Sequence, residues 1–344
     1  MANPALPRPD MPGPQPVEGT KVTPASVVPV APLLQTSGGE VPDRIFKSAM
    51  TACALAVLAV LVLIIYELVS GSGLSWHAFG FKFFGGSDWN PVSEQFGALP
   101  FIYGTLVSSL VALIIAVPLA VGVAVFTTEM CPKALRAPLS FFVELLAAIP
   151  SVIYGLWAMF ILVPLLSAYV EPFLAKTLGW SGLFEGAPYG IGMLAAGVIL
   201  AIMIIPIISS ITREVLMVVP QHQREGVLAL GATRWEMIWM GVLRNARAGI
   251  VGGIILGLGR ALGETMAVTM VIGNAPKISL SLLSPAYTMP SVIANEFAEA
   301  TSNLHSAALM EVGLILLVVT LIINMLARVL LWSVSRGAKK GVRL

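Results

Sequence analysis

Six stretches of this chain are long and apolar enough to cross a membrane as helices. Each holds about 20 or more mostly apolar residues, which is the length that a helix needs to span the hydrocarbon core. They lie at approximately residues 48–69, 101–127, 141–168, 189–211, 246–272 and 307–332. The pattern predicts an all-α integral membrane protein in which six transmembrane helices form one domain, residues 44–344.

The first 43 residues have a different pattern. Ten of them are proline, which lacks an amide donor and fixes φ, so neither a helix nor a strand is expected. No positively charged head runs directly into an apolar core, so a cleaved secretion signal is not expected either. We predict a disordered, proline-rich cytoplasmic tail over residues 1–43, followed by a first span that stays as an anchor.

Composition narrows the class of protein further. The 344 residues are 57% hydrophobic and only 11% charged, which argues against most soluble enzymes and against a disordered protein. The formal net charge of +2 gives no electrostatic support for nucleic-acid binding. Two isolated cysteines and three histidines without metal-ligand spacing predict no metal site, and no catalytic group or cofactor is predicted.

The basic residues indicate how the chain is oriented in the membrane. With the N-terminus inside, 16 of the 20 Lys and Arg residues lie in the tail, the second and fourth loops and the C-terminal end. The outer loops hold only Lys82, Lys176 and Lys277. Because Lys and Arg accumulate on the cytoplasmic side, both termini are predicted to be cytoplasmic. The one remaining basic residue, Arg260, lies inside the fifth predicted span.

The fourth loop, residues 213–245, is the longest connection on the predicted cytoplasmic side. Its apolar residues recur with gaps of one, three and four among polar ones, which is typical of an amphipathic helix. Gly231 separates two apolar groups and permits a turn, so we predict a short helix, a turn at Gly231 and a second helix that leads into the membrane. The residues alone leave two interpretations open: a helix lying on lipid headgroups, or a helix that docks into a groove of a cytoplasmic partner.

The fifth predicted span carries a charged pair, Arg260 and Glu264. On an unbroken helix, residues four apart share one face. Charge near the bilayer centre is costly, so the pair is expected to face protein or a water-filled path. Two interpretations stay open here as well. The pair holds helices together, or Arg260 lies beside an anion path, since guanidinium suits phosphate or sulfate oxygens, and Glu264 keeps it in place.

A stripe of glycines precedes this pair on the same helical arc. Gly249, Gly253 and Gly257 form two overlapping GxxxG spacings, which allow two helices to approach closely. At about 100° per residue, Arg260 and Glu264 fall within the arc of the stripe. We therefore predict a tightly packed interface there, with the partner helix in this chain or in another subunit.

Two expectations concern single residues near these spans. Glu144, at the cytoplasmic end of the third predicted span, is expected to pair with a base such as Arg136 or with interfacial water. Pro118, Pro150 and Pro206 lie within the second, third and fourth predicted spans. Since proline frees a carbonyl and bends a membrane helix, we expect each of them to kink its span.

Part of the fourth loop, "REGVLALGATRWEMIWMGVLRNA", resembles the EAA loop of ABC importer permeases. Glu225 and Gly231 match the Glu and Gly of that family at the correct six-residue offset, and Leu243 matches its Leu. The chain departs from the pattern at Gly226, Val227, Gly241 and Arg244. The resemblance implies that this loop is a coupling helix seated in a cleft of an ATPase subunit. It also implies coupling roles for Glu225, Gly226, Gly231 and Arg234.

The run "GLGRALGETMAVTMVIGN" resembles the permease subunits of phosphate ABC importers, in particular the C-type subunit of the Pst system. Residues 96–126 and 144–158 resemble the same family, so that the resemblance covers roughly residues 94–275. It implies a type I ABC importer permease (MetI-like) fold. It also implies import of inorganic phosphate by alternating access, with Arg260 and Glu264 in the substrate path.

The resemblance also implies partners. They are a second permease subunit (PstA type), two ATPase subunits (PstB type), an extracytoplasmic phosphate-binding protein (PstS type) and membrane lipid. The chain has no P-loop sequence of its own, so ATP hydrolysis is expected on a separate subunit and the chain is not expected to be an enzyme. Other functions stay open: an ABC permease for another oxyanion such as sulfate or molybdate, an ion-gradient-driven anion transporter with Glu264 as proton carrier, or a non-transporting membrane signalling subunit.

Overall fold

The computed structural model describes residues 40–340, and within that range the secondary structure is helical except for one isolated antiparallel bridge between Asn90 and Gln95. The chain divides into two compact units, one ending at Ala59 and one beginning at Val60. Most of the predicted tail lies outside the described residues, but its last four residues, 40–43, already belong to a helix. The all-α prediction is confirmed for the described part of the chain.

Six helical segments of the described chain are long and apolar enough to span a membrane: Asp43–Gly71, Leu99–Met130, Ser151–Ser181, Met193–Val218, Arg234–Gly263 and Asn303–Ser333. Their number and order confirm the prediction. The first part of the chain contains the elements α1 (Glu40–Gly71), α2 (Gly73–Phe79), α3 (Lys82–Gly85), α4 (Leu99–Val125) and its π-helical continuation η1 (Phe126–Met130).

The third predicted span is wrong at its start, because the chain forms two helices there. A separate helix, α5 (Lys133–Ala148), ends before Pro150. Proline cannot donate an amide hydrogen and holds the preceding residue in extended backbone, and Ile149 accordingly has φ −67° and ψ 129°. Pro150 therefore separates two helices instead of kinking one, whereas Pro118 and Pro206 lie inside helices as expected.

The span after Pro150 is built from short α-helical and π-helical stretches. They are α6 (Ser151–Trp157), η2 (Ala158–Leu162), α7 (Val163–Leu165), η3 (Leu166–Val170), α8 (Glu171–Leu178) and the 3₁₀ turn η4 (Gly179–Ser181). The Tyr154 hydroxyl donates a hydrogen bond of 2.7 Å to the Leu146 carbonyl, which fastens this span to α5 across the corner.

The second half of the chain contains α9 (Met193–Val218), α10 (Gln221–Ala229), α11 (Arg234–Glu236), η5 (Met237–Leu243), α12 (Arg244–Gly263), α13 (Met266–Val271), α14 (Met289–Glu296) and α15 (Asn303–Lys340). The second loop helix leads without a break into the fifth span, as predicted, so that the helical segment runs from Arg234. The predicted end of that span at residue 272 is wrong, because the helix stops at Gly263, where Glu264 adopts extended backbone with φ −71° and ψ 127°.

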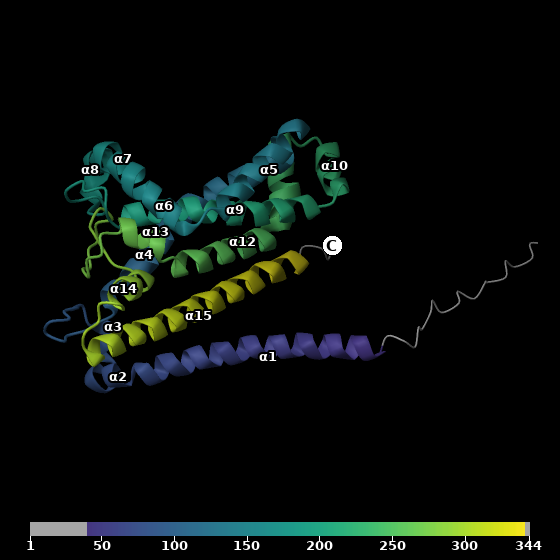
Figure 1. The fold of residues 1–344 in the computed structure, drawn as a ribbon. Coiled ribbons are helices and arrows are strands. Elements are labelled where there is room, and N and C mark those ends of the chain that lie inside the picture. Colours follow the sequence, from purple (N-terminus) through teal and green to yellow (C-terminus); the bar gives the residue numbers. More distant parts are fainter. Residues whose placement is uncertain (1–39, 341–344) are drawn as a thin grey trace, which may run out of the picture. The chain divides into compact units, whose positions relative to one another are not determined.

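Helices α4, α9 and α12 pack side by side and form the centre of the unit that begins at Val60 (Figure 1). Every fourth residue along one face of α4 is a fully buried alanine: Ala112, Ala116, Ala120 and Ala124. Side chains this small let two helix backbones approach closely. The α4–α9 contact is consequently a tight pair over most of its length, and α12 packs against α9 beside it.

An aromatic cluster fixes the loop between α13 and α14 against the start of α4. Tyr287 is 2% exposed, and its ring lies edge-on to Phe101 with 5.5 Å between centroids. Burial raises the pKa of Tyr287 to about 12, so its hydroxyl stays protonated and accepts a hydrogen bond of 2.9 Å from the Asn295 amide. Gly104 leaves room for the Tyr287 carbonyl, which a β-carbon at residue 104 would overlap.

Candidate transport site and coupling loop

Arg260 and Glu264 meet at the end of α12. Arg260 lies in the last helical turn, where the negative end of the helix dipole favours a cation. Its Nη2 is 3.8 Å from Glu264 Oε2. The pair therefore forms, but not on a shared helix face as predicted, because the helix has ended before Glu264. The contact is also longer than the about 2.7–2.9 Å of a charge-assisted hydrogen bond, so Arg260 is only loosely held.

The two side chains differ sharply in exposure. The Arg260 side chain is 45% exposed and that of Glu264 is 7% exposed. The other Glu264 oxygen, Oε1, accepts a hydrogen bond of 3.4 Å from the Ala267 amide at the start of α13. One buried carboxylate therefore contacts both sides of the helix break. Since non-helical backbone at membrane depth is tolerated where it is buried or lines water, the break suits a water-filled path.

The predicted glycine stripe packs against α9 of the same chain. A β-carbon at Gly249, Gly253 or Gly257 would lie closest to a side chain of α9 in each case, and those side chains follow in order: Val215, Ile211 and Ile208. The Arg260 side chain does not share this buried interface, contrary to the predicted common arc, since it is 45% exposed. The stripe thus places α12 close to α9 and leaves the guanidinium accessible.

The coupling loop has a turn where the sequence predicted one. Gly231 adopts φ +86°, a left-handed conformation that glycine tolerates, between α10 and α11. Thr233 then starts α11 with a capping box, in which Glu236 Oε2 accepts a hydrogen bond of 2.8 Å from the Thr233 amide. Leu230 is 89% exposed and Trp235 is 65% exposed, so the turn presents apolar side chains to its surroundings.

The polar residues predicted to act in coupling are also exposed. Glu225 and Gly226 lie on α10, where Glu225 Oε1 accepts a hydrogen bond of 2.9 Å from the Gln221 amide. Arg234 begins α11 and lines, together with Glu129 and Trp235, a cavity of about 530 Å³. The loop therefore offers both charge and apolar surface to a partner. In the described part of the chain, no group of His, Cys, Asp or Glu side chains is placed to hold a metal ion.

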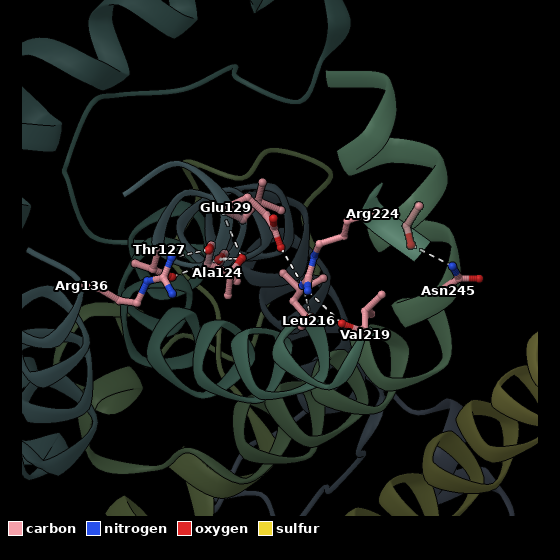
Figure 2. A network of polar contacts seen from close by, with 11 residues as sticks. Ala124, Thr127, Glu129, Arg136, Leu216, Val219, Arg224 and Asn245 are labelled. Atoms are coloured by element: carbon pink, nitrogen blue, oxygen red, sulfur yellow. Dashed lines mark hydrogen bonds and ion pairs between the residues drawn. The ribbon is translucent and has the colours of Figure 1, made fainter. Parts of the chain in front are cut away.

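Arg224 is the centre of a polar network beneath this loop (Figure 2). Its guanidinium donates to the carbonyls of Leu216 and Val219, each at 2.8 Å, and pairs with Glu129 at 2.9 Å. Sequence reasoning used Arg224 only as a topological charge. The signal that it missed is positional: an arginine one turn into the helix after Pro220 can reach back to the end of the preceding helix.

Glu144 pairs with a base, as predicted, but that base is not Arg136. Glu144 pairs with Arg213 of α9 at 2.8 Å, and Arg136 instead donates a hydrogen bond of 2.6 Å to the Thr128 carbonyl (Figure 2). Thr128 lies in the π-helical stretch η1, and its carbonyl is within reach of α5. This carbonyl takes the place of the Glu144 carboxylate as the acceptor for Arg136. Arg136 therefore ties α5 to the end of α4.

Comparison with known proteins identifies the family. Residues 116–336 match the family described as "Binding-protein-dependent transport system inner membrane component". The chain belongs to this family. As an inner-membrane transport component it is a permease and not an enzyme, and the matched segment contains the coupling loop, Arg260 and Glu264.

The permease is similar to curated phosphate permeases along most of its length. It is 48% identical to "Phosphate transport system permease protein PstC" of Mesorhizobium japonicum over 85% of this chain and 91% of that protein. It is 39% identical to a probable phosphate transport system permease protein PstC of Methanocaldococcus jannaschii, over 69% of this chain and 75% of that protein. Among solved structures, the inward-facing methionine ABC transporter MetNI matches with a TM-score of 0.48 and 20% identity, over 69% of this chain and 94% of that chain.

Proposed function

We propose that this chain is the permease subunit of an ATP-driven importer that moves inorganic phosphate across the cytoplasmic membrane. One observation carries the proposal: the helical segment Arg234–Gly263 runs without a break from the coupling turn to Arg260. A partner that moves the turn therefore moves the guanidinium beside the helix break. The 48% identity to a phosphate permease supports phosphate as the substrate.

The complex contains four further subunits. A second, related permease chain completes the pathway, two cytoplasmic ATPase subunits drive it, and an extracytoplasmic phosphate-binding protein delivers the anion. The 16 to 3 distribution of basic residues supports an orientation with both termini and the coupling loop in the cytoplasm. ATP-driven closure of the ATPases displaces the loop at Glu225, Gly226, Gly231 and Arg234, and the spans then open alternately to each side.

Arg260 acts as the anion contact in this mechanism. A guanidinium presents five N–H donors in a planar fork that matches phosphate oxygens, and its 3.8 Å contact with Glu264 leaves that fork available. Glu264 keeps Arg260 in place and offsets part of its positive charge. An anion bound next to this pair is consequently held less tightly than at an isolated arginine, which favours release after each step.

Reconstitution of the five-subunit complex in liposomes tests this function. We expect phosphate uptake that requires both ATP and the loaded binding protein, and that excess sulfate or molybdate does not inhibit. Uptake driven by an ion gradient through this chain alone would instead establish the secondary-transporter alternative. Inhibition by sulfate would move the assignment to another oxyanion, and an assembled complex without any uptake would favour a signalling subunit.

Replacing Glu225 with alanine tests the role of the coupling loop in the same liposomes. We expect ATP-dependent phosphate uptake to fall about tenfold, within the about 5- to 150-fold range of energetic coupling between sites. The reason is that Glu225 is exposed on α10 and, among residues 40–340, its side chain hydrogen-bonds to Gln221 alone, so its loss affects a partner more than the fold. Glu214→Ala, an exposed glutamate of α9, is the control. Uptake by Glu225→Ala that equals uptake by Glu214→Ala and by the unmodified complex would show that the loop is a surface helix without a coupling role.

A further inference from the structure

Arg224 joins the coupling loop to two membrane helices at one point. Its Nη1 donates to the Val219 carbonyl and its Nη2 to the Leu216 carbonyl. Val219 is the C-cap residue of α9 and Leu216 lies in its last turn, where the carbonyl also accepts a hydrogen bond of 3.3 Å from the Val219 amide. Carbonyls at this end carry the negative partial charge of the helix. The same Nη2 pairs with Glu129 in η1, the direct continuation of α4.

The contact is partly buried, so losing one partner is more costly than in a surface ion pair. The Glu129 side chain is 9% exposed and that of Arg224 is 21% exposed. Removing one member of such a pair leaves the other as an uncompensated charge away from water. The planar guanidinium fork holds its N–H donors in fixed directions, whereas the three donors of lysine rotate about one compact charge on a flexible stem.

Helix α10 is held from its other side as well. The Asn245 amide of α12 donates a hydrogen bond of 2.9 Å to Gln223 Oε1 of α10 (Figure 2). Neighbouring residues 223 and 224 therefore connect one short helix to α12 on one side and to the α4–α9 pair on the other. Helix α12 also packs on α9 through its glycine stripe. The three helices can therefore move together only if the contacts of Gln223 and of Arg224 both persist while the loop moves.

We propose that Arg224 is a positioning residue that transmits the movement of the coupling loop to the α4–α9 pair, in step with α12. This inference rests on the proposed function, because it concerns the path by which ATP-driven motion reaches the membrane helices. Arg224 acts through Glu129 and the carbonyl end of α9.

The test is the number of phosphate ions imported per ATP hydrolysed by the reconstituted complex. For Arg224→Lys we expect this ratio to fall about tenfold, within the range of coupling between sites, while ATP hydrolysis stays within about twofold of the unmodified complex. For Glu129→Gln we expect a smaller fall, about fivefold, at the lower end of that range, because glutamine keeps an oxygen acceptor and the two carbonyl contacts stay in place.

Arg213→Gln is the matched control. Arg213 lies on α9, the helix that Arg224 contacts from α10, and it also makes an ion pair, of 2.8 Å. Its partner Glu144 is 58% exposed, so the import ratio is expected to stay unchanged. An unchanged ratio in Arg224→Lys would overturn the proposal, whether both rates stay the same or import and hydrolysis fall in proportion. If Arg224→Lys does not assemble, an unchanged ratio in Glu129→Gln overturns it. Import by the unmodified complex tests the proposed function separately.

Discussion

Arg260→Ala is expected to abolish phosphate uptake, lowering it by about 100-fold or more, while the complex still assembles. In the proposed anion contact, the variant loses two charge-assisted hydrogen bonds, each contributing about 1.5–3 kcal/mol, and about 3 kcal/mol corresponds to somewhat more than 100-fold. Folding loses little, because the side chain is 45% exposed and makes one contact of 3.8 Å. Uptake of radiolabelled phosphate by proteoliposomes measures the effect, and subunit stoichiometry after size-exclusion chromatography measures assembly.

The conservative variant sharpens this experiment. Arg260→Lys keeps the charge and loses the bidentate fork, so uptake is again expected to fall, to a smaller extent than in Arg260→Ala. Arg244→Gln, an exposed arginine at the other end of α12, is the control and should transport normally. Normal uptake in either Arg260 variant would contradict the anion-path role and leave Arg260–Glu264 as an ion pair that only stabilises the helix end.

Gly104→Ala is expected to destabilise the permease severely. A β-carbon at residue 104 overlaps the backbone carbonyl of Tyr287, and Tyr287 is itself 2% exposed, so neither side has room to move. Overpacking of a well-packed core costs about 1–3 kcal/mol and occasionally more, and we expect the upper end or beyond. The measurement is the thermal unfolding temperature of the complex purified in detergent.

Gly122→Ala on the same helix is the matched control for that experiment. A β-carbon there meets nothing within 4 Å, and alanine in a helix is favoured over glycine by about 1 kcal/mol. This variant should therefore unfold at the same temperature as the unmodified permease or slightly higher. Equal unfolding temperatures for both variants would show that the approach of α4 to the loop at Tyr287 is not close in the folded protein.

Hydropathy predicted the number and order of the spans because a run of about 20 apolar residues is a coarse and robust signal. It did not predict where two of them break. The interruption at Glu264 follows from packing. Helix α13 packs closely on α6, since a β-carbon added at Gly155 would lie 3.1 Å from the Ala267 Cα. Glu264 in turn contacts the first turn of α13. An average over an apolar window contains neither contact.

The candidate site was likewise predictable in part. The four-residue spacing brought Arg260 and Glu264 together even though the helix ends between them, because the arginine side chain is long enough to reach around the break. The glycine spacing indicated a close helix neighbour without naming it. The Arg224 network was not predictable, since two of its acceptors are backbone carbonyls and the third, Glu129, is 95 residues away.

The unbroken helix from Arg234 to Gly263 also sets a mechanical scale. At about 1.5 Å per residue, the distance along it from Arg234 to Arg260 is roughly 40 Å. If the coupling end acts as the pivot of a lever arm of that length, a tilt of about 5° carries the guanidinium about 3–4 Å sideways. That is comparable to the 3.8 Å that separates Arg260 from Glu264. A small rotation at the membrane surface is thus sufficient to make or break an ionic contact roughly 40 Å away, at the other end of the helix.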